Sequence, residues 1–196
     1  MPRRILIING HPENNPSRLC WALAQAYADG ARSAGHYVRR IDLATIDIPL
    51  LRSQADFETG KIPDLLQPTA TSVEWAEHLV FVFPLWLGTM PAVLKAFLEQ
   101  IMRPGTAFSY PTDKREAVTK SLLAGRSARL IVTMGMPVIL YRVWFLSHGV
   151  AVLRRNILNF IGIRPVHQTL FGTVHSAKTR QTALIGKVRK LGERAS

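Results

Sequence analysis

Residues 81–99, FVFPLWLGTMPAVLKAFLE, contain the strand, turn and helix on which the fold prediction depends. The run from His78 to Phe83 is apolar, as expected of a parallel strand covered on both faces. Pro91 marks the start of a helix expected to end near Met102, because proline favours the first helical position. A turn that leaves a strand is usually polar, but this one carries two leucines, a tryptophan and a methionine. These side chains must cover an apolar surface, which belongs either to the protein or to a ligand.

Strands and helices alternate along the rest of the chain. The sequence predicts strands at residues 4–9, 37–43, 78–83 and 128–133, and a fifth within 164–172. It predicts helices at residues 17–34 (with Ser17 as N-cap), 69–77, 91–102, 141–160 and 179–191, with irregular chain at 45–67 and 103–120. This alternation favours an α/β fold with a doubly wound, five-stranded parallel sheet and helices on both faces. Residues 1–196 are expected to form a single domain.

The composition is that of a globular protein. Of the 196 residues, 47% are apolar and 19% are charged, which is enough to build one sizeable core. No apolar run reaches the roughly 20 residues that span a bilayer, and the N-terminus is typical of a first strand rather than a signal peptide. The single cysteine, Cys20, excludes an internal disulfide and a cysteine-rich metal site. We therefore expect no metal, a cytoplasmic location and a buried Cys20 that acts as a small hydrophobe.

The charge balance is strongly basic. Lys and Arg total 25 against 13 Asp and Glu, a net charge of +12. Such an excess attracts nucleic acid, anionic membranes or phosphorylated cofactors. The cations are dispersed, and no basic run is interleaved with aromatic residues. The sequence therefore predicts no nucleic-acid binding, whereas a position beside an anionic membrane remains compatible with the charge.

The three turns that follow Asn9, Phe83 and Thr133 are the expected ligand site, because ligands bind at the carboxyl ends of strands in such sheets. The first turn, residues 10–18, lacks both GxGxxG and GxxxxGK[ST]. Its Ser17 and Arg18 nevertheless precede a helix, where backbone N–H groups favour an anion. An ordinary capped turn explains the same residues equally well.

The second and third turns are apolar. Trp86 suits the edge of a flat aromatic ligand, although a lone tryptophan is more often a core or subunit contact. Gly135 permits close backbone approach after the fourth strand. One anion-binding turn beside two apolar turns predicts a ligand with a phosphate at one end and a planar ring at the other. A flavin nucleotide has this shape and polarity.

The segments IINGHPENNPSRLCWAL, FVFPLWLGTMPAVLKAFLEQI, GTAFSY and VTMG occur here in a family-specific order and spacing. In these segments the chain resembles the flavodoxin-like NAD(P)H:quinone oxidoreductases, a group that includes ancillary subunits of glutathione-gated potassium efflux systems. The resemblance covers residues 4–175 and implies a flavodoxin-like flavin-binding domain. It also implies a homodimer with each active site at the subunit interface.

The resemblance assigns site residues position by position. The phosphate and ribityl end of the flavin would contact His11, Ser17, Arg18 and Leu19. The isoalloxazine ring would contact Pro84, Leu85, Trp86, Leu87, Thr133, Met134 and Gly135. Catalytic roles would belong to Tyr141 and His148, although His148 is offset by about one residue from the histidine of the relatives. An amphipathic helix with a merely solvent-facing or buried His148 is the alternative. The departures from the family pattern are Gly135-Met136, where relatives have paired glycines, and the unusually apolar segment 138–146.

The implied reaction is a two-electron, ping-pong transfer of hydride from NAD(P)H, through the bound flavin, to a quinone or similar acceptor. Backbone N–H groups in the turns after Phe83 and Thr133 would stabilise the negative charge of the reduced ring. The alternative functions are a regulatory flavoprotein subunit of a potassium efflux system, a one-electron carrier and, against the dispersed cations, a nucleic-acid-binding domain. The basic charge counts against the carrier, because short-chain flavodoxins are typically acidic. The sequence does not distinguish FMN from FAD, or NADH from NADPH.

Overall fold

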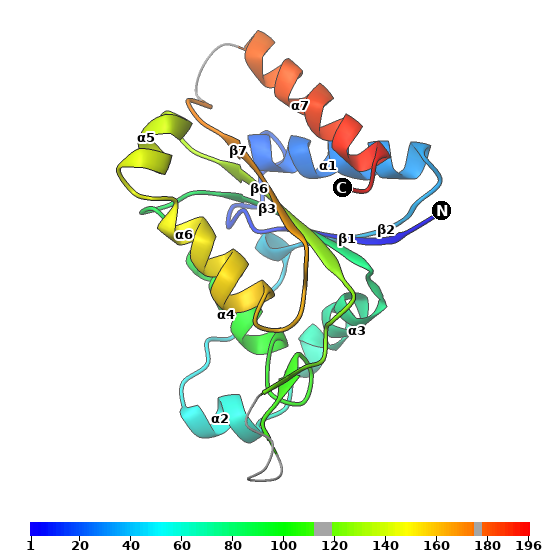
Figure 1. The fold of residues 1–196 in the computed structure, drawn as a ribbon, viewed down its shortest axis with the longest axis vertical. Coiled ribbons are helices and arrows are strands. Elements are labelled where there is room, and N and C mark those ends of the chain that lie inside the picture. Colours follow the sequence, from blue (N-terminus) through cyan, green and yellow to red (C-terminus); the bar gives the residue numbers. More distant parts are fainter. Residues whose placement is uncertain (112–118, 175–177) are drawn as a thin grey trace.

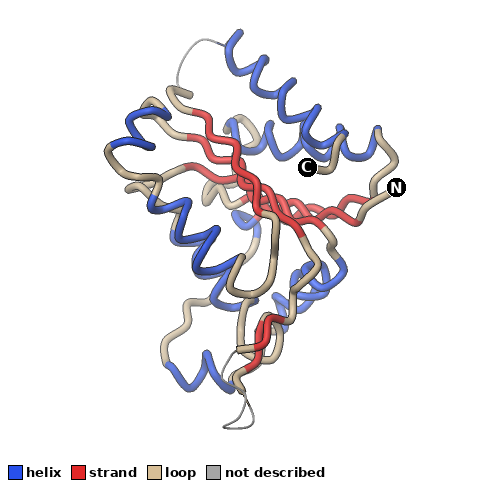
Figure 2. The backbone as a smooth tube through the Cα atoms, in the orientation of Figure 1, coloured by secondary structure: helices blue, strands red, loops and turns tan. Residues whose placement is uncertain are grey.

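The computed structural model describes residues 1–111, 119–174 and 178–196. Five parallel strands form the central sheet in the order β2-β1-β3-β6-β7 (Figures 1 and 2). Their bounds are β1 Arg4–Asn9, β2 Tyr37–Asp42, β3 His78–Pro84, β6 Ser127–Thr133 and β7 Val166–Phe171. The order confirms the predicted doubly wound sheet. The switch point of its strand order lies between β1 and β3, with β2 added on one side and β6 and β7 on the other.

Helices cover both faces of the sheet, as Figure 1 shows. One face carries α1 (Leu19–Ser33) and α7 (Lys178–Glu193), and the other carries α3 (Gln67–Trp75), α4 (Ala92–Ile101) and α6 (His148–Ala151), which continues into the π-helical segment η3 (Val152–Leu158). Alternating side chains of each strand serve the two cores. In β1, Ile5 and Ile7 pack with α1, while Leu6 and Ile8 pack with α4 on the opposite face.

Two stretches predicted as irregular contain short elements. Residues 45–67 contain α2 (Gln54–Thr59) and the 3-10 turn η2 (Asp64–Leu66), and a further turn, η1 (Leu43–Thr45), precedes them. Ser53 begins α2 by accepting the Asp56 backbone N–H at 3.1 Å. Strand β4 (Phe108–Ser109) pairs with β5 (Lys120–Ser121) in the region expected to be a polar loop, of which residues 112–118 lie outside the described part.

The helix predicted over residues 141–160 is interrupted, which corrects the sequence prediction. Helix α5 (Val138–Val143) ends early, Leu146 and Ser147 adopt left-handed backbone angles, and α6 then begins. The cause is a tertiary contact with the turn after β3. Gly149 packs so closely on that turn that a Cβ there would lie 2.0 Å from the Gly88 carbonyl oxygen. A continuous helix from Tyr141 is therefore replaced by two segments.

The start of α1 also differs from the prediction. Arg18, not Ser17, occupies the N-cap position, and it makes no side-chain capping hydrogen bond. Asn15 accounts for this, because its Oδ1 accepts both the Ser17 N–H at 3.0 Å and the Ser17 hydroxyl at 2.7 Å. The Ser17 side chain thus stabilises the preceding turn rather than the helix.

Helices α1 and α7 cross at two glycines, which lets their backbones touch. A Cβ at Gly30 would lie 2.0 Å from the Arg189 carbonyl oxygen, and one at Gly192 would lie 2.2 Å from that of Tyr27. The apolar side chains of α7 pack on this side of the sheet, where Val188 is fully buried. This crossing brings the N-terminal half of α7 to the carboxyl edge of the sheet (Figure 1).

Candidate functional site

The carboxyl ends of β3, β6 and β7 meet at one edge of the sheet. Pro84 is in register with Thr133, and Thr133 with Phe171. Hydrogen bonds join the turns that follow: Leu85 N–H donates to the Thr133 carbonyl at 2.7 Å, and Met134 N–H donates to the Phe171 carbonyl at 2.8 Å. The turn after β1 is attached to the same edge through Gly10 N–H, which donates to the Val82 carbonyl at 2.8 Å.

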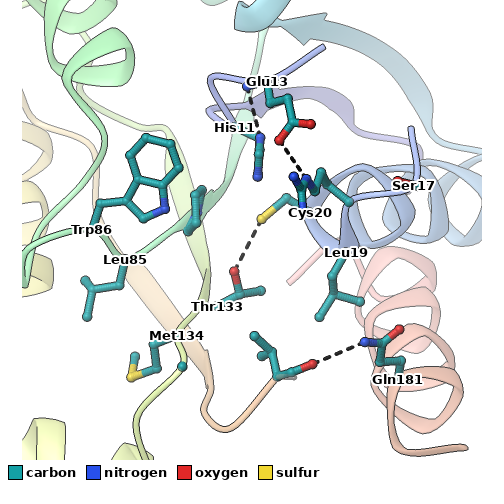
Figure 3. Close-up of a pocket in the computed structure, with 14 residues that line it drawn as sticks. His11, Glu13, Ser17, Leu19, Cys20, Leu85, Trp86, Thr133, Met134 and Gln181 are labelled. Carbon is teal, nitrogen blue, oxygen red and sulfur yellow. Dashed lines mark hydrogen bonds and ion pairs between the residues drawn. The ribbon is translucent and has the colours of Figure 1, made fainter. Parts of the chain in front are cut away.

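A cavity of about 420 Å³ opens at this edge, between the turns and the first turn of α1 (Figure 3). It is lined by His11, Glu13, Ser17, Arg18, Leu19, Cys20, Pro84, Leu85, Trp86, Thr133, Met134, Gly135, Val174 and Gln181. Ten of the eleven residues that the sequence assigned to flavin binding lie in this lining, and the exception is Leu87. Its volume lies in the range of small-molecule sites.

One end of the cavity carries the groups suited to an anion. The first-turn N–H groups of α1, at Leu19 and Cys20, have no acceptor within the helix and add the positive end of its dipole. Arg18 contributes a guanidinium, whose Nε donates to the Glu13 carboxylate at 2.6 Å. The hydrogen bond from Arg18 holds the pKa of Glu13 below its usual range, and Asn15 adds to the effect. Glu13 is therefore ionised at neutral pH.

His11 connects this end of the cavity to the turn after β3, which we call the apolar turn. Its Nδ1 accepts the Glu13 backbone N–H at 3.1 Å, which assigns the neutral-ring proton to Nε2. Burial lowers the pKa of the imidazole, outweighing the opposing charge of Glu13. The ring lies edge-on to Trp86, with centroids 6.2 Å apart and planes at 75°. A neutral His11 thus supports the half-exposed indole from one side (Figure 3).

The other end of the cavity is apolar, with Leu85, Trp86 and Met134 around it (Figure 3). Trp86 N–H and Thr89 N–H donate to each other's carbonyl groups at 2.9 and 3.0 Å, which closes the turn. The backbone N–H groups of Leu85, Trp86 and Met134 are therefore used within the protein. The sequence predicts that N–H groups of these turns stabilise a reduced ring; these three already donate to carbonyl groups of the protein, so that prediction now concerns the other N–H groups of the two turns.

Cys20 lies in the cavity wall beside Thr133. Its Sγ is 3.4 Å from the Thr133 Oγ1, and the residue is 2% exposed. Burial raises the pKa of the thiol to about 12, so the thiol stays protonated and unreactive at neutral pH. This confirms the predicted small buried hydrophobe.

Leu87, Tyr141 and His148 lie outside the cavity. Leu87 points fully into solvent, and His148 lines a neighbouring shallow depression together with Leu87. Tyr141 is completely buried; its hydroxyl donates to the Gly88 carbonyl at 3.3 Å and accepts the Val150 N–H at 3.1 Å. Tyr141 thus contacts the apolar turn from the protein interior. His148 lies on the surface depression at the other side of that turn.

Sequence reasoning did not assign Glu13, Val174 or Gln181 to the site. Glu13 stands in the same turn as His11 and Arg18, so its position alone could have identified it. Val174 follows β7, and applying the carboxyl-end rule to the fifth strand would have found it. Gln181 comes from α7, where its Nε2 donates to the Val174 carbonyl at 3.1 Å. No sequence signal connects Gln181 to this edge. Among the residues that the structure describes, no three His, Cys, Asp or Glu side chains gather to hold a metal ion.

A family model described as the flavodoxin-like fold matches residues 3–195 of the chain. The chain belongs to this flavodoxin-like family, that of the NAD(P)H:quinone oxidoreductases and azoreductase-like flavoproteins. An FMN-dependent NADH:quinone oxidoreductase of Staphylococcus haemolyticus is 24% identical over 201 residues, covering 91% of this chain and 90% of that protein. A ribosyldihydronicotinamide dehydrogenase-like protein of Penicillium crustosum is 30% identical over 156 residues, 67% of this chain. That match spans 57% of the fungal protein's length.

The flavodoxin-like architecture is also found in solved structures. A crystal structure of a Streptococcus mutans protein superposes with a TM-score of 0.81 at 26% identity, covering 97% of this chain and 98% of that one. Family membership therefore agrees with the sheet order and with the position of the cavity at the switch point between β1 and β3.

Proposed function

We propose that this flavodoxin-like protein is an FMN-dependent NAD(P)H:quinone oxidoreductase whose cofactor occupies the cavity at the carboxyl edge of the sheet. The observation that carries the proposal is the polarity of that cavity, which has an anion-binding helix start at one end and Trp86 at the other. FMN is preferred to FAD because the Staphylococcus haemolyticus relative is named as FMN-dependent.

The residues present fit such a cofactor. The first turn of α1, Ser17 and Arg18 would hold the phosphate, with Leu19 beside the ribityl chain. Pro84, Leu85, Trp86, Thr133, Met134 and Gly135 would line the ring. The bound flavin would supply two-electron redox chemistry, accepting hydride from NAD(P)H and reducing a quinone.

The chain's own residues would orient the ring and exclude water from one side of it. His11 supports Trp86 as a neutral ring, and the buried Cys20 thiol adds no competing redox group. Tyr141 would act as a positioning residue, because its hydroxyl joins the Gly88 carbonyl to the start of α6 without reaching the cavity. His148 lines the neighbouring depression together with Leu87 and Gly88 of the apolar turn. It would contact a substrate that extends out of the cavity.

The decisive experiment is the visible spectrum of the purified protein, with mass analysis of any released chromophore. The protein stripped of chromophore is then titrated with FMN and, separately, FAD. We expect FMN to bind tightly and to restore NAD(P)H oxidation that depends on added quinone. NADH and NADPH assayed in parallel identify the preferred reductant.

The proposal is contradicted by a protein that binds neither flavin. Tight FMN binding without quinone-dependent turnover would leave the cofactor site in place but overturn the enzymatic assignment. Replacing His148 with Gln should lower kcat for the quinone step while leaving FMN affinity unchanged, since His148 lies outside the cavity.

A further inference from the structure

Four residues outside the cavity hold the turn that carries its anion-binding end. They are Asn9 at the end of β1, Arg40 and Asp42 at the end of β2, and Trp21 on α1. Because β1 and β2 are parallel neighbours, with Asn9 in register with Asp42, these side chains meet beside the turn of residues 10–18. We call the four residues the anchoring cluster.

Asn9 fixes the first residues of the turn. It is completely buried, and its Oδ1 accepts the His11 backbone N–H at 3.3 Å. Its Nδ2 donates to the Asp42 carboxylate at 2.9 Å, which holds the amide in this orientation. His11 is one of the residues that line the cavity (Figure 3). The carboxylate on β2 thus helps to determine, through a single buried amide, where His11 lies.

Trp21 holds the middle of the same turn. Its indole Nε1–H donates to the Glu13 backbone carbonyl at 3.1 Å. The Glu13 N–H in turn donates to His11 Nδ1 at 3.1 Å, so the contacts made by Asn9 and Trp21 act on one connected segment. Arg40 lies over the indole, with its guanidinium carbon 5.2 Å from the ring centroid, which is within the range of a cation–π contact.

Arg40 joins the two halves of the anchoring cluster. Its Nε and Nη2 donate to one oxygen of Asp42 at 3.0 and 2.7 Å, and its Nη1 donates to the Gln25 side chain at 2.8 Å. The side chains of Arg40 and Asp42 are only 15% and 21% exposed. Charge-assisted hydrogen bonds that are shielded in this way hold their geometry, whereas an exposed ion pair contributes little.

The neighbouring Arg39 offers an internal comparison. It also stacks on a tryptophan, with its guanidinium carbon 4.2 Å from the Trp75 ring centroid, and it contacts Ser72 of α3. Successive residues of a strand point to opposite faces of the sheet, so Arg39 faces α3 while Arg40 faces α1 and the turn. The two arginines thus share their charge and their type of contact, and differ in whether they hold the turn.

We propose that the anchoring cluster is a set of positioning residues that preorganises this turn for the phosphate of the flavin. The inference rests on the proposed function, because it takes the phosphate to bind at Ser17, Arg18 and the first turn of α1. A turn already held in its binding conformation loses less conformational entropy when the ligand binds, and so binds it more tightly. The cluster should therefore raise the affinity for FMN more than that for riboflavin, which has the same ring and ribityl chain but no phosphate.

The test is titration of the flavin-free protein with FMN and, separately, with riboflavin, followed by the quenching of flavin fluorescence. We expect the wild type to bind FMN at least about tenfold more tightly than riboflavin. Trp21→Phe keeps an aromatic ring under Arg40 but removes the Nε1–H, and should lower this ratio of affinities about three- to tenfold. Arg40→Gln should lower it by a similar factor. The matched control, Arg39→Gln, removes the same charge one residue away and should keep the wild-type ratio.

Asp42→Ala separates positioning from simple electrostatics. The change removes a negative charge near the phosphate, so an effect of charge alone would strengthen FMN binding. Loss of the contacts that Asp42 makes with Asn9 and Arg40 would weaken it instead. We expect the ratio of FMN to riboflavin affinity to fall about tenfold. Riboflavin binding by the same variant shows that the rest of the flavin site is intact.

The inference is overturned if Asp42→Ala raises the ratio, or if Trp21→Phe and Arg40→Gln keep the wild-type value. Trp21→Phe preserves the ring, so it decides the question even if Asp42→Ala does not fold. Equal binding of FMN and riboflavin by the wild type would also overturn the inference, because the phosphate would then take no part, but it would leave the flavin site in place. A wild-type protein that binds neither flavin would contradict the proposed function itself, and this inference with it.

Discussion

The Nε of Arg18 lies 2.6 Å from a carboxylate oxygen of Glu13, and both side chains line the cavity at the start of α1. The only cation contributed by this turn is thus already paired with an acid of the same turn. Any phosphate that binds here meets both the guanidinium and the neighbouring carboxylate. The carboxylate of Glu13 therefore weakens the binding of an anion, which Arg18 and the first turn of α1 favour.

Replacing Glu13 with Gln should strengthen FMN binding. The change removes one negative charge and frees Arg18 for the phosphate, so the Kd should fall about two- to fivefold, as expected for loss of an exposed ion pair. Quenching of flavin fluorescence measures the change. Glu99→Gln is the control, because Glu99 pairs with Lys95 on α4, away from the cavity. An unchanged or weaker affinity in the Glu13 variant would show that the phosphate does not bind beside Arg18.

Alanine substitutions at Trp86 and Leu94 should have opposite effects on FMN affinity and on the free energy of unfolding. Trp86 is 50% exposed at the cavity, so Trp86→Ala should raise the Kd for FMN about tenfold and change stability little. Leu94 is fully buried on α4, and Leu94→Ala should cost about 2–5 kcal/mol of unfolding free energy. Flavin titration and urea unfolding of both variants provide the comparison. Equal loss of stability in the two would mean that Trp86 is a core residue.

Tyr141→Phe should weaken the link between the apolar turn and α6. The hydroxyl accepts the buried Val150 N–H and donates to the Gly88 carbonyl, so its removal leaves a buried donor unpaired. We expect a loss of about 1–3 kcal/mol in unfolding free energy. Tyr37→Phe removes the hydroxyl of a 63% exposed tyrosine and should change stability by less than about 0.5 kcal/mol. If kcat falls in the Tyr141 variant without any loss of stability, the hydroxyl acts in catalysis and not in positioning.

Acid should destabilise the protein through His78. The side chain is fully buried, bonded to the hydroxyls of Tyr27 (3.1 Å) and Ser127 (2.8 Å), and faced by Arg3 and Arg129. Burial, with a smaller contribution from these cations and from His167 and His36, lowers its pKa from 6.5 to about 3.

Between those two pH values the unfolded chain takes up a proton that the folded protein excludes. The stabilising contribution is therefore complete above pH 6.5 and is lost as the pH falls towards 3. The unfolding free energy should decrease by up to about 1.4 kcal/mol per pH unit in this window. Urea unfolding at several pH values tests this. His78→Gln should be less stable at neutral pH but show a flatter pH dependence, whereas His148→Gln, an exposed residue that is not among the groups facing His78, should keep the wild-type slope.

Local sequence determined the strands, their order along the chain and the turns that carry the ligand site. The apolar run of β3 and the β-branched run of β1 are short, buried and bounded by Gly and Pro, so their pattern depends little on distant contacts. Because parallel strands end at one edge, the hydrophobic pattern alone is enough to bring together the turns after Asn9, Pro84 and Thr133.

Tertiary contacts decided the rest. The helix beyond Tyr141 breaks because Gly149 packs against Gly88, a residue sixty-one positions away that no local pattern reveals. Gln181 enters the cavity because Gly30 and Gly192 let α7 cross α1 closely. Trp144 is exposed because it lies in the link between α5 and α6, where the helix is interrupted. The sequence by itself thus determined the sheet and which turns meet, since these follow from short-range hydrophobic patterning. The tertiary structure alone decided which side chains reach the cavity and which apolar residues face solvent, since both depend on packing between segments far apart in the chain.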